Sequence, residues 1–225
     1  MKLFKYLISC SLIIITSMTA CSQDEKHRSV KDLLTAAADN DTTAIQSLLK
    51  ANANLEARDS KKRTPLMIAA YHHHTAAAAL LIAAGADVNA QDDMLNSPFL
   101  YAGAEGYTDI LQLCLHAGAR FDVYNRYGGS ALIPACERGH VDVVKTLLAV
   151  KDFPIDHVNR LGWTALLEAI ILSNGGPKHV EIVQLLVDAG ANVNLADGDG
   201  VSPLAHARSK GFTAIVKILE KAGAR

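Results

Sequence analysis

A segment of similar sequence recurs along this chain at a nearly fixed interval. The heptapeptides TPLMIAA, SPFLYAG, SALIPAC, TALLEAI and SPLAHAR begin at Thr64, Ser97, Ser130, Thr164 and Ser202, which are 33, 33, 34 and 38 residues apart. A second helical pattern and an exit such as GADVN or GANVN follow the copies. Periods of this length are typical of repeat proteins, in which each unit buries its apolar side against its neighbours. We therefore expect an all-α repeat solenoid.

The residues around each heptapeptide carry the signals of two short helices. Every copy opens on Thr or Ser, which are favoured N-cap residues, and Pro65, Pro98 and Pro203 stand at the first helical position, where a missing N–H costs nothing. Gly106 and Gly139 are placed to end the first helix of their copies. The glycines placed to end the second helix are Gly85, Gly118, Gly190 and Gly223.

The heptapeptide resembles the T-P-L-H-x-A signature of ankyrin repeats, whose period is about 33 residues. This resemblance implies stacked helix-turn-helix repeats with hairpin-like finger loops over residues 29–225. The signature histidine is absent from every copy, and Pro134 lies inside a first helix, where we expect it to remove one backbone hydrogen bond. The insertion SNGGPK at 173–178 lengthens one copy. The expected repeats are 29–58 as N-terminal cap, 59–91, 92–124, 125–158, 159–196, and 197–225 as C-terminal cap.

The N-terminus has the features of an export signal. Lys2 and Lys5 precede a short apolar run, which predicts a signal peptide over 1–20 that is too short to span a bilayer. The sequence MTAC resembles the lipobox of bacterial lipoproteins, which implies a lipid on Cys21 and a polar tether over 21–28. Ser22 resembles outer-membrane rather than inner-membrane sorting. We therefore expect a periplasm-facing protein anchored by lipid in the bacterial cell envelope. The alternative is a plain cleaved signal, giving a soluble periplasmic or secreted protein that acts on a host protein.

Neither catalysis nor a cofactor is indicated by the motifs. No Gly-rich phosphate loop or G-x-S-x-G elbow occurs, and the acids are scattered without a recognisable spacing. An envelope enzyme with an unrecognised site remains the alternative. The run 72–74 of three histidines is not expected to bind metal, because three successive side chains rarely aim at one ion. In register, His74, His140 and His179 occupy one structural slot at the start of the second helix.

Two cysteines, Cys114 and Cys136, fall in slots normally filled by small or apolar core residues. We expect two buried free thiols. A disulfide between adjacent repeats is the alternative that an oxidising compartment permits.

A protein partner is the binding class that the sequence favours. The formal net charge is −1, and removal of residues 1–20 would take away two lysines, so nucleic acid is not expected. In ankyrin binders, partners contact the finger loops and the ends of the first helices. We expect this protein to be a monomer. The excess of basic over acidic residues on the fingers suggests a partner with an acidic patch. The positions carried over are Lys61, Arg63, Tyr71, His72, Met94, Arg126, Tyr127, Arg138, Arg160, Leu161 and Trp163.

The expected centre of that surface is the set Arg126, Tyr127, Arg160 and Trp163, because Trp, Tyr and Arg dominate interface hot spots. The alternative is that Trp163 folds over its own loop and the arginines are solvated.

Overall fold

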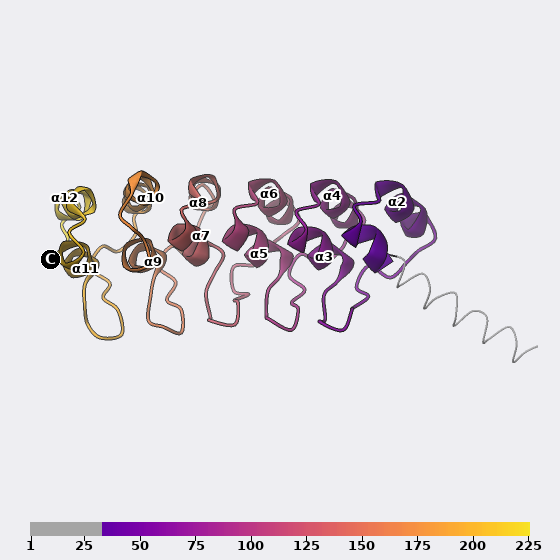
Figure 1. The fold of residues 1–225 in the computed structure, drawn as a ribbon, viewed down its shortest axis with the longest axis horizontal. Coiled ribbons are helices and arrows are strands. Elements are labelled where there is room, and N and C mark those ends of the chain that lie inside the picture. Colours follow the sequence, from indigo (N-terminus) through magenta and orange to yellow (C-terminus); the bar gives the residue numbers. More distant parts are fainter. Residues whose placement is uncertain (1–32) are drawn as a thin grey trace, which may run out of the picture.

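The computed structural model describes residues 33–225, which form two parallel rows of helices (Figure 1). The first-helix row contains α3 (Pro65–Tyr71), α5 (Pro98–Glu105), α7 (Leu132–Arg138), α9 (Ala165–Ile171) and α11 (Pro203–Ser209). The second-helix row contains α2 (Thr42–Lys50), α4 (Thr75–Ala83), α6 (Thr108–His116), α8 (Val141–Leu148), α10 (Pro177–Asp188) and α12 (Thr213–Lys221).

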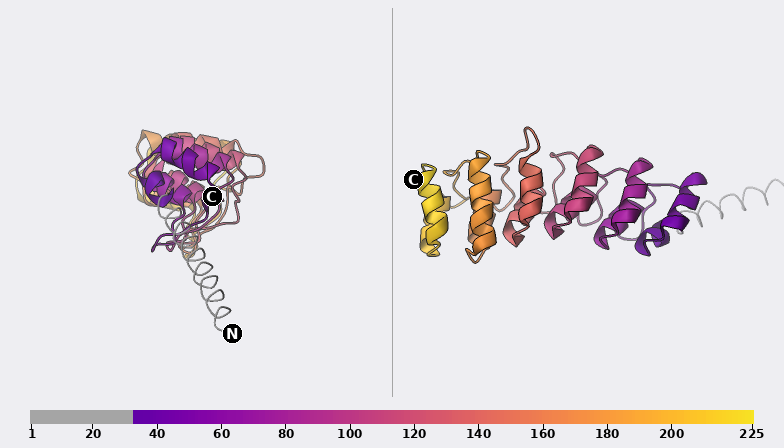
Figure 2. Two further views of the ribbon diagram at one scale, coloured as in Figure 1. Left: turned by 90° about the vertical axis from the view of Figure 1, so that its right-hand side faces the viewer. Right: turned by 90° about the horizontal axis from the view of Figure 1, so that it is seen from above.

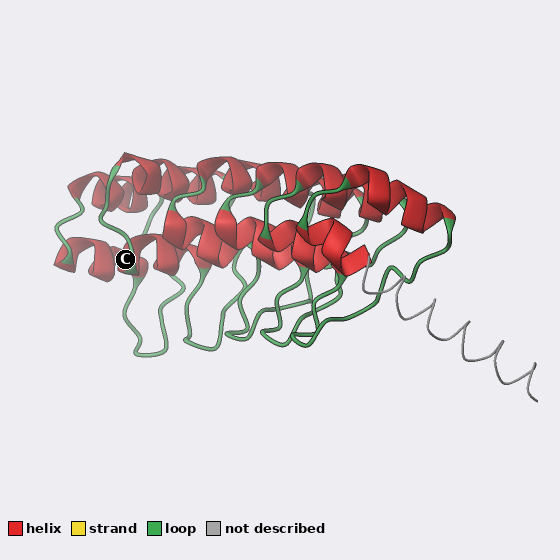
Figure 3. Cartoon of the chain, turned by 45° about the vertical axis from the view of Figure 1, so that its right-hand side comes forward, coloured by secondary structure: helices red, strands yellow, loops and turns green. Residues whose placement is uncertain are grey.

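The repeats follow one another in a single file, and a helical segment over 33–38 precedes α2 (Figure 2). Long loops, the fingers, all project from the side of the first-helix row (Figure 3). No strand occurs within 33–225. The expected all-α repeat solenoid is therefore confirmed.

The predicted N-caps position four of the first helices. Thr64, Ser97, Thr164 and Ser202 each accept a hydrogen bond through the side-chain oxygen from the backbone N–H three residues later, at 3.1–3.3 Å. These bonds satisfy donors that a helix N-terminus otherwise leaves without partners.

Ser130 is the exception, and its expected role as the N-cap of the fourth repeat is wrong. Helix α7 begins at Leu132 with Ala131 as its N-cap, and the buried Ser130 Oγ has no hydrogen-bond partner. In the other repeats the N-cap carbonyl also accepts from the N–H four residues later, as Glu168 N donates to Thr164 O at 3.0 Å. Pro134 occupies that position here and has no N–H. The first turn of α7 consequently fails to close on Ser130.

Replacing Pro134 with alanine should raise the free energy of unfolding by about 1 kcal/mol, because it returns one backbone N–H to Ser130 O. Urea denaturation would measure this. Ser130→Ala serves as the matched control: it should be neutral in the wild-type chain and destabilising in the Pro134→Ala background, where the hydroxyl can cap. An unchanged midpoint for Pro134→Ala would show that packing around Ala131, rather than the proline, sets the start of α7.

The facing sides of the two rows enclose one continuous apolar core. Leu66, Leu111 and Leu147 are among its fully buried side chains. Cys114 and Cys136 are buried free thiols, as predicted. Burial raises the pKa of Cys114 to about 12, so this thiol is inert at neutral pH.

Gly103 of α5 lies close against Ala131, the N-cap residue of α7. A Cβ at this position would lie 2.7 Å from Ala131 Cβ and 3.0 Å from Ala131 O, and the latter atom belongs to the backbone. Gly103→Ala should therefore destabilise the protein by about 1–3 kcal/mol, although alanine is the better helix former. Thermal unfolding would test this, and an increase in Tm would mean that α5 and α7 can separate freely.

Histidine rings connect the second helices to the preceding repeat. His74 Nδ1 donates to Ala37 O at 3.1 Å, and His179 Nε2 donates to Glu137 O at 2.9 Å. His179 shares this contact with the preceding repeat but not the N-cap position. His74 and His140 are the N-caps of α4 and α8, whereas α10 begins two residues before His179, at Pro177. The last two residues of the 173–178 insertion form the start of α10, and the His179 ring still contacts the preceding repeat.

The signal peptide, Cys21 and the tether over 21–28 lie outside the described residues. Within 33–225, every helix is too short or too polar to cross a membrane. The same part of the chain contains no group of three His, Cys, Asp or Glu side chains arranged to hold a metal ion.

Candidate functional site

All five fingers are built on the same turn, which begins at an Asp or Asn. In the fifth repeat, Asn159 Oδ1 accepts hydrogen bonds from Leu161 N at 2.9 Å and Trp163 N at 3.0 Å, and Asn159 N donates to Trp163 O at 3.0 Å. A residue with positive φ follows three positions after the Asp or Asn in each finger, as at Leu95 with φ 58° and Gly162 with φ 79°. These side chain to backbone bonds fix the loop conformation. The residues that begin the turns are Asp59, Asp92, Asn125, Asn159 and Asp197.

Neighbouring fingers are also joined to each other. Asp93 N donates to Lys61 O at 3.1 Å, and Arg160 N donates to Tyr127 O at 2.8 Å. The Arg160 guanidinium adds a bond to Arg126 O at 2.8 Å. The fingers therefore form a connected ribbon beside the first helices.

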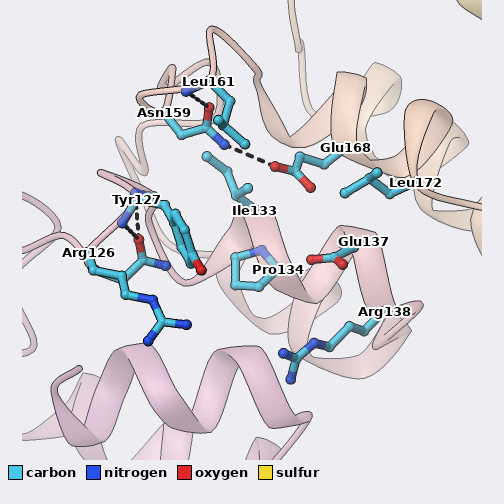
Figure 4. Close-up of a pocket in the computed structure, with 12 residues that line it drawn as sticks. Arg126, Tyr127, Ile133, Pro134, Glu137, Arg138, Asn159, Leu161, Glu168 and Leu172 are labelled. Carbon is cyan, nitrogen blue, oxygen red and sulfur yellow. Dashed lines mark hydrogen bonds between the residues drawn. The ribbon is translucent and has the colours of Figure 1, made fainter. Parts of the chain in front are cut away.

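A pocket with a volume of about 350 Å³ lies between the fingers and first helices of the fourth and fifth repeats (Figure 4). Its apolar lining consists of Tyr127, Ile133, Pro134, Leu161 and Leu172. Three of these side chains are unusually exposed for their type: Tyr127 at 50%, Leu161 at 55% and Leu172 at 48%. Exposed apolar groups gathered around a concavity are typical of binding surfaces.

Two carboxylates occupy the same pocket. Glu168 of α9 is only 4% exposed, and its Oε1 accepts a hydrogen bond from Asn159 Nδ2 at 2.9 Å. Its Oε2 has no hydrogen-bond partner within 33–225. This oxygen is not completely buried, so it is accessible from the pocket. Glu137 of α7 projects into the same space (Figure 4). Burial, and secondarily the charge of Glu137, raise the pKa of Glu168 to about 7, while the bond from Asn159 acts in the opposite direction.

The two arginines of the pocket rim are engaged elsewhere. Arg138 NH1 donates to Glu105 Oε1 at 2.5 Å and to Ala104 O at 2.9 Å. The Arg126 guanidinium lies over the Tyr127 ring, 4.8 Å from its centroid, and contacts Met94 Sδ at 3.4 Å. No ion pair joins either arginine to a pocket carboxylate within the described residues.

A second group of predicted residues lies on the fingers and first helices of the second and third repeats. Arg63 pairs with Asp59 at 2.6 Å, and its guanidinium is 5.7 Å from the centroid of the Tyr71 ring. The Tyr71 hydroxyl donates to Asp92 Oδ2 at 2.7 Å, and its ring is 4.2 Å from that of Tyr101. Burial and the bond to Asp92 raise the pKa of Tyr71 to about 12. The polar groups and the Tyr71 ring therefore already have partners within the protein.

The remaining predicted residues divide between exposed positions and the finger framework. Lys61, His72 and Met94 are exposed and lie outside the pocket lining. Arg160 is exposed but ties the fourth finger to the fifth, and the partly buried Trp163 does not line the pocket. The expected centre is thus split, because the pocket contains only Arg126 and Tyr127 of its four residues.

The predicted set did not include several residues that line the pocket, among them Pro134, Asn159, Glu168 and Leu172. A signal existed for two of them. Glu168 stands in the fifth position of its heptapeptide, where the other copies have Ile68, Tyr101, Pro134 and His206. Asn159 stands in register with the residues that begin the other finger turns. Leu172, just beyond the end of α9, carried no sequence signal.

The comparison with known families matches the model described as "Ankyrin repeats (3 copies)" to residues 2–92 and 99–197. The chain belongs to the ankyrin-repeat family. The ankyrin repeat protein YahD of Escherichia coli K12 is 48% identical over 81 residues, which are 36% of this chain and 40% of YahD. The chain thus matches less than half the length of that relative. Ankyrin repeats are protein–protein interaction modules.

Solved structures show the same architecture. An ankyrin repeat domain from Acinetobacter baumannii AYE has a TM-score of 0.84 and 53% identity, over 86% of this chain and 98% of that one. The ankyrin repeat protein EF0377 has a TM-score of 0.83 and 42% identity, over 85% and 98% of the two chains. An ankyrin solenoid with finger loops is therefore shown.

Proposed function

We propose that this protein is a non-catalytic binding module that holds a partner protein against the fingers and first helices of its second to fifth repeats. The observation that carries this proposal is the pocket between the fourth and fifth repeats, with exposed Tyr127, Leu161 and Leu172 around it. Its walls come from loops that are fixed by hydrogen bonds before any partner arrives. Solenoids of this family present such an extended surface to their partners.

The rim of this surface suits acidic groups. Lys61 is exposed on the second finger, and Arg126, on the fourth, forms no ion pair with a carboxylate within the described residues. An acidic patch on the partner would meet these two residues on either side of Met94. Because such pairs are exposed, they favour orientation and association rate more than affinity.

Photo-crosslinking in cells tests the location of the partner. A photoreactive residue in place of Leu161 should give one dominant adduct, which a Tyr127→Asp substitution abolishes. The matched control places the same residue at the exposed Gln112 of α6, in the second-helix row. Adducts that form only from Gln112, or only from residues 173–176 of the insertion, would contradict a binding surface on the fingers.

The sequence further supports a lipid anchor at Cys21, which would hold the module at the bacterial envelope, facing the periplasm and preferentially at the outer membrane. Two or more acyl chains give stable anchoring, whereas one gives reversible binding. Metabolic labelling with a fatty-acid analogue tests this proposal. Cys21→Ala should abolish the label and move the protein from the membrane fraction to the soluble fraction. A variant with unchanged location would instead indicate a soluble exported protein.

A further inference from the structure

The fifth repeat differs from the second, third and sixth repeats in the hydrogen bonds that its acidic side chain accepts. In the second, third and sixth repeats the finger turn begins at an Asp whose second oxygen accepts from a donor: Asp59 from Arg63 at 2.8 Å, Asp92 from Tyr71 at 2.7 Å, and Asp197 from His206 at 2.7 Å. In the fifth repeat the turn begins at a neutral Asn159, and the acid has moved to Glu168 on the first helix. The Oε2 of this glutamate has no donor within the described residues.

The position of Glu168 makes this imbalance costly. A buried carboxylate needs a hydrogen bond or an opposite charge to offset the loss of hydration, and Glu168 has one bond and a like-charged neighbour in Glu137. The helices α10 and α11, which also pack on α9, contribute no residue to the pocket lining. Arg126 and Arg138 line the pocket, but they make their contacts with other groups and form no ion pair with Glu168. No group of the described chain therefore supplies the missing positive charge.

We propose that the pocket takes a basic side chain, arginine or lysine, of the partner protein, and that its cation lies between Glu168 Oε2 and Glu137. This inference rests on the proposed binding function and adds its specificity. The apolar walls formed by Tyr127, Ile133 and Leu161 suit the aliphatic stem of such a side chain, which commonly packs on apolar surface while its head stays polar. The two carboxylates also fit a planar guanidinium, which can donate hydrogen bonds to both.

The composition of the walls argues against a metal ion as the occupant. Calcium sites surround the ion with six to eight oxygen ligands, whereas this pocket offers two carboxylates. The side-chain oxygens of Asn125 and Asn159 already accept hydrogen bonds from backbone N–H groups. The arginines at the rim do not fill the place either, because Arg138 is bonded to Glu105, and Arg126 lies over the Tyr127 ring and contacts Met94 Sδ.

Binding of a cation should depend on pH. The pKa of Glu168 is raised to about 7, and a cation favours the ionised carboxylate, so below this pH the proton must leave before the basic side chain enters. Affinity for a basic peptide should consequently weaken as pH falls from 7 to 5.5, by at most about tenfold per pH unit. Glu168→Gln should remove this dependence, whereas Glu137→Gln should shift it to lower pH, since it removes the like charge.

Selection of binders from a random heptapeptide phage library tests the inference on the full-length protein in detergent. Selected peptides should share an arginine or lysine, and replacing it with norleucine should weaken binding at least tenfold. The Glu137→Gln, Glu168→Gln double variant should lose affinity to a similar extent. Glu181→Gln, on exposed α10, is the matched control and should bind like the wild type.

The outcomes separate this inference from the binding function itself. The selected peptides could lose binding to the Leu161→Asp variant and yet have no basic residue in common. This result would overturn the basic-side-chain assignment and leave the binding function in place. A selection without any peptide that depends on Leu161 or Tyr127 would overturn both.

Discussion

Replacing Asn159 with alanine should lower the free energy of unfolding by about 3 kcal/mol, because three groups lose a partner at one site. Asn159 is 7% exposed, and its oxygen accepts from the backbone N–H of Leu161 and of Trp163 while its amide donates to Glu168. An unpaired buried donor or acceptor costs about 1–3 kcal/mol, and partial access of water to the finger reduces the sum. Urea denaturation at neutral pH is the measurement.

Asn159→Asp is the matched control for this prediction. It keeps the oxygen that accepts from the two backbone N–H groups, but it replaces the amide that faces Glu168 with a second carboxyl. Two carboxyls at this distance are expected to share a proton, so the variant should be close to wild-type stability in acid and should weaken as pH rises through neutrality. A loss below about 1 kcal/mol for Asn159→Ala would mean that water replaces the amide, and that the finger conformation does not depend on this side chain.

Glu168→Gln should stabilise the protein at pH 8, by at most about 3 kcal/mol. The pKa of Glu168 is raised from 4.5 to about 7, so between these values the folded state binds more protons than the unfolded state. Wild-type stability must then decrease as pH rises from about 4.5 to 7, and the contribution of this group levels off above that range. The glutamine keeps an oxygen for Asn159 Nδ2 and carries no charge, so the variant avoids this decrease.

Urea denaturation of both proteins at several pH values from 5 to 8 would check this prediction. The difference in unfolding free energy between variant and wild type should grow with pH. Glu137→Gln is the control. By removing the like charge it should lower the pKa of Glu168, so the pH range over which stability decreases should become narrower. A difference that is constant across this range would show that Glu168 ionises normally in the folded protein. If Glu168→Gln is more stable than the wild type and also loses affinity for basic peptides, then Glu168 lowers the stability of the fifth repeat in exchange for binding.

The sequence was sufficient for the architecture because local signals and the period agreed. Thr64, Ser97 and Thr164 cap their helices as predicted, and the exception at Ser130 follows from the N–H that Pro134 lacks. The fifth position of the heptapeptide neither caps the helix nor carries a constant residue type, so the period alone does not indicate its role.

The candidate site was predicted less completely, for a different reason. Finger positions such as Tyr127 and Leu161 follow from the period, and both line the pocket. Whether two acids from adjacent repeats meet depends on stacking geometry, which brings Glu137 and Glu168 together across 31 residues of sequence. Arg160 and Trp163 have the residue types of a hot spot, but a residue type does not reveal that Arg160 is committed to the neighbouring finger.

The bond from Arg160 N to Tyr127 O has a consequence for the kinetics of recognition. It joins the two loops that form opposite walls of the pocket, so the separation of Tyr127 and Leu161 is set when the chain folds. Loops ordered in this way lose little further conformational entropy when a partner arrives. Encounters should therefore succeed without a slow rearrangement, and substitutions in the pocket should act mainly on the lifetime of the complex rather than on its rate of formation.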